Sequence, residues 1–71
     1  MKMHINVKPF YSYRGELYYG GQKTKLETMA PSEAKAKQNL IAQLAKNINM
    51  QIVHVAGYFK ANPSYITVMK V

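Results

Sequence analysis

The chain has 71 residues, of which ten are lysine or arginine and three are glutamate, giving a formal net charge of +7 and a pI near 9.8. A chain of this length predicts a single domain, residues 1–71, with a thin core, and the absence of cysteine excludes disulfides, thiol nucleophiles and cysteine-based metal sites. No apolar run is long enough for a signal peptide or a membrane span, so we expect a cytoplasmic protein.

The charge is distributed unevenly along the chain. Residues 1–33 hold five cations and three acids, whereas residues 34–71 hold five lysines and no acid. Such an excess in a small folded protein is typical of a polyanion binder, although lysines also keep small proteins soluble. Nine of the ten cations are lysine, which favours contacts to phosphates over the reading of bases. The predicted partner is therefore DNA or RNA, bound through its phosphate backbone.

The N-terminal half has the alternation of β-strands. In residues 3–13, Met3, Ile5 and Val7 fall on one face, which predicts a half-buried strand. Arg14-Gly15 suits a two-residue turn, after which the chain would run back. Gly20-Gly21 suits either a second turn or a bulge in one long strand over residues 16–28.

A helix is predicted over residues 31–48. Pro31 suits the first turn, Glu33 complements the helix dipole, and asparagines at 47 and 49 tolerate the left-handed conformation that ends helices. Lys37 projects from the middle of the apolar stripe of this helix. Either its stem packs while its ammonium reaches past the sheet edge, or the first turn overhangs the core and Lys37 contacts a ligand.

The remaining residues predict two more strands. The segment 50–59, MQIVHVAGYF, is rich in β-branched residues and is typical of a central strand. A turn over 60–64 would lead to a last strand over 65–71. The expected fold class is α+β, an antiparallel sheet of four or five strands in the order ββ-α-ββ. One helix covers a single face of such a sheet, so the other face is open.

No catalytic constellation is present. The three glutamates are scattered over a turn, a strand and a helix start, and the two histidines, His4 and His54, lie on different predicted strands. Two histidines without cysteine or a nearby acid make a poor metal site, and no serine has a base at a recognisable spacing. We therefore expect no enzyme activity, no metal and no cofactor.

The candidate site is the open face of the sheet. If Ile5 and Val7 face the helix, Phe10 and several cations face away from it. Tyr11 and Tyr18 are expected to pair across the hairpin and stabilise it, whereas Tyr19, beside the glycines, is expected to present an exposed ring. The predicted nucleic-acid-binding residues are Lys8, Arg14, Tyr19, Lys23, Lys25, Lys35 and Lys37, with Phe10 as a second stacking ring.

Two resemblances favour nucleic acid. Residues 16–46 resemble in outline the arm-type DNA-binding domains of phage integrases. In those domains a small antiparallel sheet is followed by a helix that begins with a Glu-Ala pair, here Glu33-Ala34. The segment SEAKAKQNLIAQL resembles the second helix of double-stranded-RNA-binding domains but lacks the paired lysines that open that helix. Neither family has two strands after the helix, as predicted for residues 50–71, so the resemblances imply a class of partner and no family.

The leading expectation is a small basic nucleic-acid-binding protein of phage or mobile-element type. The alternative is a protein-interaction module, a small inhibitor or adaptor that docks on an acidic host protein or pairs through an exposed edge strand such as residues 65–71. A homodimer formed through such an edge strand is a further expectation, because a chain this short gains core by pairing.

Overall fold

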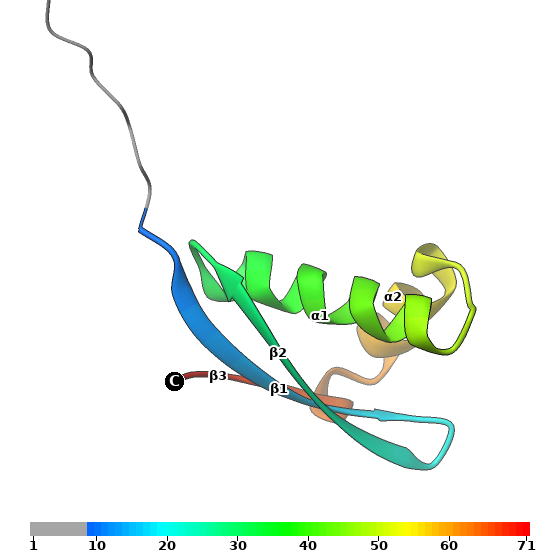
Figure 1. Cartoon of the computed structure of the whole chain (residues 1–71). Coiled ribbons are helices and arrows are strands. Elements are labelled where there is room, and N and C mark those ends of the chain that lie inside the picture. Colours follow the sequence, from blue (N-terminus) through cyan, green and yellow to red (C-terminus); the bar gives the residue numbers. More distant parts are fainter. Residues whose placement is uncertain (1–8) are drawn as a thin grey trace, which may run out of the picture.

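The computed structural model describes residues 9–71 and shows an α+β fold (Figure 1). The predicted strand around Met3, Ile5 and Val7, the cation Lys8 and His4 lie outside the described residues. The elements follow one another as β1 (Tyr11–Tyr19), β2 (Gln22–Ala30), α1 (Glu33–Asn47), α2 (Ile52–Ala61), a short 3-10 turn η1 (Pro63–Tyr65) and β3 (Ile66–Lys70).

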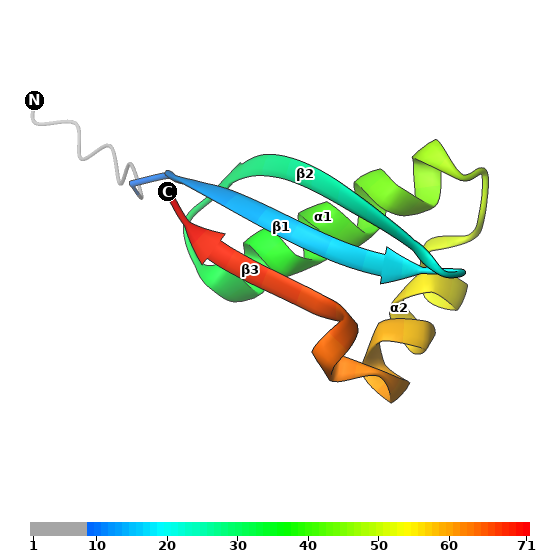
Figure 2. The ribbon, with the colours of Figure 1, turned by 90° about the horizontal axis from the view of Figure 1, so that it is seen from below.

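The three strands form one antiparallel sheet in the order β2-β1-β3, so β1 is central. Helix α1 lies across one face, and the opposite face carries no helix (Figure 2). We call this second face the open face. One helix on one face of an antiparallel sheet was expected, but the order ββ-α-ββ with four or five strands was wrong: residues 9–71 hold three strands and two helices.

The predicted turn at Arg14-Gly15 is also wrong. Strand β1 runs straight through both residues, and the chain reverses at Gly20-Gly21. Those two glycines have φ values of 60° and 80°, the left-handed pair that a two-residue hairpin turn requires. Gly15 has another role: it faces α1, and a Cβ there would collide with the side chain of Leu40. The glycine permits close approach of helix to sheet.

Helix α1 forms where it was predicted. Ser32 caps it by accepting a hydrogen bond from the backbone N–H of Lys35 at 3.3 Å, and Glu33 lies in the first turn. Beyond its C-terminus Asn49 takes a φ of 57°, the left-handed conformation expected of an asparagine there. The residues that α1 buries are Ala36, Leu40, Ile41, Leu44 and Ala45.

The predicted central strand over residues 50–59 is instead helix α2. Its buried residues, Val55 and Phe59, lie one helical turn apart and are 0% and 1% exposed. They complete the core around Leu17 and Leu44 at the hairpin end of the sheet. Packing at this spacing therefore outweighs the β preference of valine and isoleucine, which is a weak and context-dependent one.

Candidate functional site

The open face is assembled by alternation along the strands. Because Tyr13, Gly15 and Leu17 point toward α1 and are buried, the even-numbered residues of β1 point the other way. The strand register then aligns the side chains of the open face in four cross-strand rows: Lys23 and Tyr18; Lys25, Glu16 and Thr67; Glu27, Arg14 and Met69; Met29 and Ser12. Just outside β3, Tyr65 lies near Tyr18 and Val71 near Ser12.

Two of the three cations on this face are paired with carboxylates. Nε of Arg14 lies 3.3 Å from Oε2 of Glu27, its direct cross-strand neighbour, and Nζ of Lys23 lies 2.8 Å from Oε1 of Glu16. The hydrogen bond from Lys23 holds the pKa of Glu16 below its ordinary value, and the same bond raises the pKa of Lys23. Among residues 9–71, Lys25 is the open-face cation without an ion pair.

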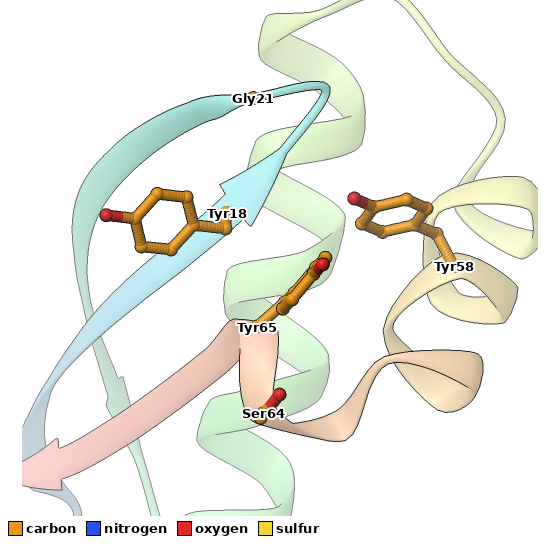
Figure 3. A pocket seen from close by; sticks show the side chains of 5 residues that line it. All are labelled: Tyr18, Gly21, Tyr58, Ser64 and Tyr65. Atoms are coloured by element: carbon orange, nitrogen blue, oxygen red, sulfur yellow. The ribbon is translucent and has the colours of Figure 1, made fainter.

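A tyrosine-lined hollow of about 490 Å³ opens at the hairpin end of the sheet. Its walls are Tyr18 from β1, Gly21 from the turn, Tyr58 from α2, and Ser64 and Tyr65 from η1 (Figure 3). We call it the tyrosine hollow. The ring centroids of Tyr18 and Tyr65 are 6.4 Å apart, and those of Tyr58 and Tyr65 are 5.9 Å apart.

The rings of the tyrosine hollow are accessible from solvent. Tyr18 is 47% exposed and Tyr65 is 42% exposed, and Nζ of Lys23 lies 6.0 Å from the centroid of the Tyr18 ring. The polar side-chain groups of the lining are hydroxyls, which both donate and accept hydrogen bonds. Such a hollow suits a flat aromatic group held by stacking, next to a cation that would attract an anion.

Of the predicted site residues within 9–71, the structure brings three together on one face and separates the others from them. Arg14, Lys23 and Lys25 share the open face, as expected. Lys35 and Lys37 are exposed on α1, on the opposite side of the sheet, so they do not join that surface. Phe10 precedes β1 and is 59% exposed.

The expectation of an exposed ring at Tyr19 was wrong. Tyr19 points toward the helices, is half-buried, and packs edge-on against Tyr58 at 4.6 Å between centroids. The expected pairing of Tyr11 with Tyr18 was wrong too, because both lie on β1 and Tyr11 opposes Ala30. The exposed ring is that of Tyr18. In one continuous strand β1, Tyr18 follows Arg14 and Glu16 at every second position and therefore points to the open face with them.

None of the residues that line the hollow is among the predicted site residues. The sequence pattern places Tyr58 in a predicted strand and Tyr65 at the start of the last predicted strand. Only the turn of α2 and η1 brings Tyr58 and Tyr65 beside the β1–β2 hairpin. Their shared position therefore depends on a helix that local sequence preference did not reveal.

Lys37 lies at the other side of the molecule, beside β3. With Glu33, Ala34, Ile66 and Val68 it lines a second hollow of about 310 Å³, between the first turns of α1 and the sheet edge. We call this the edge hollow. The side chain of Lys37 is exposed there, as expected of a lysine that projects from an apolar stripe past the edge of a sheet.

Within residues 9–71, no three histidine or carboxylate side chains gather closely enough to hold a metal ion. None of the helices over these residues has both the length and the apolar character needed to cross a bilayer. Comparisons with protein-family models, with curated proteins and with solved structures find no match to this chain.

Proposed function

We propose that the protein binds single-stranded nucleic acid on the open face, without catalysing a reaction. One observation carries the proposal: Tyr18 and Tyr65 present neighbouring solvent-accessible rings, and Lys23 lies directly across the strands from Tyr18. Unpaired bases stack on aromatic side chains exposed on a sheet, while neighbouring cations contact the phosphates. Stacking of this kind contributes about 1–3 kcal/mol per base.

The ion pairs on the open face are compatible with phosphate binding. The Arg14–Glu27 pair is solvent-exposed, with side-chain exposures of 48% and 69%, and exposed pairs of this type contribute only about 0–1 kcal/mol. A phosphate can therefore replace Glu27 as the partner of Arg14 at little cost. The other exposed cations of the chain add a long-range attraction for any polyanion.

The proposal is tested by fluorescence anisotropy with labelled single-stranded and double-stranded DNA and RNA across a salt titration. We expect single strands to bind more tightly than duplexes, with affinity falling steeply as salt rises. Lys25→Ala should weaken binding and reduce the salt slope by about 0.7, the value for one phosphate contact to a single strand.

The matched control is Lys46→Ala, which removes the same charge from the exposed surface of α1. We expect it to change affinity much less than Lys25→Ala does. Equal effects of the two variants would show that the open face is not the binding surface. Absence of binding to every oligonucleotide at low ionic strength would reject the proposed function altogether.

A second candidate function is docking on another protein. Met50, which precedes α2, and Ile52 and Val53 in its first turn are 41%, 55% and 74% exposed. Exposed apolar side chains grouped in this way are typical of protein interaction sites. A stoichiometric complex that persists at high salt would favour this function over nucleic-acid binding, whose affinity depends on released counterions.

A further inference from the structure

The two edge strands of the sheet, β2 and β3, differ in whether their outward backbone groups have hydrogen-bond partners. At the outer edge of β2, α1 supplies side-chain donors to the strand's carbonyl oxygens. Nδ2 of Asn39 donates to the carbonyl of Met29 at 3.3 Å, and Nε2 of Gln43 donates to the carbonyl of Glu27 at 3.1 Å. These amides occupy two of the backbone acceptors that another strand would need, so α1 covers the part of the β2 edge around Glu27 and Met29.

The outer edge of β3 is open. The backbone N–H of Val71 donates to the carbonyl of Ser12 at 2.8 Å, which fixes the alternation of the β1–β3 ladder. Because hydrogen-bonded positions alternate along an antiparallel pair, the N–H and C=O of Val68 point away from β1, as do the backbone groups two residues to either side. No segment within residues 9–71 pairs with this edge.

Strand β3 also lacks the features that protect exposed edges. Its sequence, Ile-Thr-Val-Met-Lys, has no proline and one charge, at Lys70. Nζ of Lys70 lies 3.6 Å from the centroid of the Tyr11 ring on β1, so this charge is drawn inward over the sheet. Natural edge strands are usually guarded by charges, proline or a cover. In the described part of the chain β3 has no proline and no cover, and its one charge, at Lys70, lies over the Tyr11 ring.

The edge hollow lies directly beside this open edge. The first turns of α1 bring Glu33 and Lys37 over it, above Ile66 and Val68 of β3. A strand added to β3 would therefore lie next to the first turns of α1. The charged residues that line the hollow are Glu33 and Lys37, which lie one helical turn apart on α1.

We propose that a second copy of this chain pairs with β3 across this edge, giving a continuous six-stranded antiparallel sheet. The two-fold axis passes through Val68, so that Val68 faces Val68 and Ile66 of one copy faces Lys70 of the other. This register uses only backbone groups that point away from β1. The two-fold symmetry also places Glu33 of each copy toward Lys37 of the other copy.

A second copy fits this edge better than an unrelated strand, because a two-fold interface requires a surface that complements itself. The backbone donors and acceptors of a strand centred on Val68 complement those of an identical antiparallel strand. The charges of Glu33 and Lys37 likewise complement those of a second copy. The pairing also adds apolar burial to a protein whose core is thin. The inference is independent of nucleic-acid binding, since the pairing uses the backbone of β3 and the α1 side of the sheet and none of the cations or rings proposed to bind nucleic acid.

The test measures the oligomeric state of the full chain by sedimentation from low micromolar to millimolar concentration. We expect a reversible dimer. Glu33→Lys and Lys37→Glu should each weaken it about tenfold, because each replaces two exposed cross-subunit ion pairs by repulsion. The double variant with both substitutions should restore dimerisation. A monomer at all concentrations, or a dimer insensitive to all three variants, would overturn the proposal.

Amide hydrogen exchange at Val68 provides a second readout that does not depend on substitution. We expect slow exchange of the Val68 N–H at high protein concentration and fast exchange on dilution below the dissociation constant. Circular dichroism at both concentrations checks that the fold persists. Slow exchange at every concentration would show that the chain's own residues cover the edge, and fast exchange at every concentration would show that nothing does. Either result would contradict pairing with a second copy.

Discussion

The two faces of β1 differ in almost every property although they belong to one strand. Tyr13, Gly15 and Leu17 are buried under α1, whereas Arg14 and Tyr18 lie exposed on the open face. Since alternation alone separates them, each position of this strand serves either the core or the candidate site. Substitutions on the two faces should therefore have opposite consequences, for folding on one side and for binding on the other.

The largest effect is expected from the core face. Leu17 is 0% exposed, and Leu17→Ala should lower the free energy of unfolding by about 2–5 kcal/mol through lost burial and a cavity. Its neighbour Glu16 points to the open face and forms an exposed ion pair, so Glu16→Ala should cost much less than Leu17→Ala. Urea denaturation of both variants gives the comparison, and similar costs would show that the assignment of faces is wrong.

Substitutions at two separate glycines, Gly15 and Gly57, are expected to give the next largest change in stability. Gly15→Ala should destabilise the fold by about 1–3 kcal/mol, because the added methyl meets Leu40, which is fully buried. Gly57→Ala is the control: nothing lies within 4 Å of a Cβ there, in the middle of α2. This second change should stabilise the protein by about 0.5–1 kcal/mol. Thermal unfolding would refute close helix–sheet packing at Gly15 if both substitutions were stabilising.

Neighbouring tyrosines separate binding from stability. Tyr18→Ser should weaken binding of single strands about fivefold or more, because a stacking ring is lost, and should leave stability nearly unchanged. Tyr19→Ser should do the reverse, lowering stability by about 1–3 kcal/mol, because Tyr19 packs against Tyr58. Anisotropy and urea titrations on both variants check this, and a loss of binding confined to Tyr19→Ser would reverse the assignment of the two rings.

The smallest effect is a pH dependence on the open face. The hydrogen bond from the Lys23 ammonium lowers the pKa of Glu16, so this pair adds stability at neutral pH that is lost as the pH falls through the lowered pKa. For Lys23, whose pKa the same bond raises, the contribution is lost as the pH rises through the raised pKa. Lys23→Gln should flatten the stability profile at both ends. Profiles identical to the unsubstituted protein would show that the pair is not formed in solution.

The sequence predicts those elements whose local signals agree with their packing. The segment from Ser32 to Asn49 has a cap, a helix-forming interior and a left-handed stop, and α1 forms there. The alternation of Lys23 and Lys25 with inward residues likewise places both on the open face. In these regions the local preference and the tertiary environment require the same conformation.

Prediction fails where distant contacts decide the conformation. Gly15 has the local character of a turn residue, but its role is set by Leu40, which lies on another element. The β-branched run before Phe59 has strand propensity, but the space beside Leu17 and Leu44 is filled at helical spacing. The tyrosine hollow depends on that helix, so its residues could not be grouped from local pattern alone.

The central claim is that the open face, and not the helical side, binds nucleic acid. Its most direct test is a set of two-dimensional NMR spectra recorded during titration with an unlabelled single-stranded oligonucleotide. The account predicts shift changes concentrated at Arg14, Tyr18 and Lys25, with little change at Lys35 and Lys46 on α1. Changes concentrated at Lys35 and Lys46, with the open face unaffected, would contradict it.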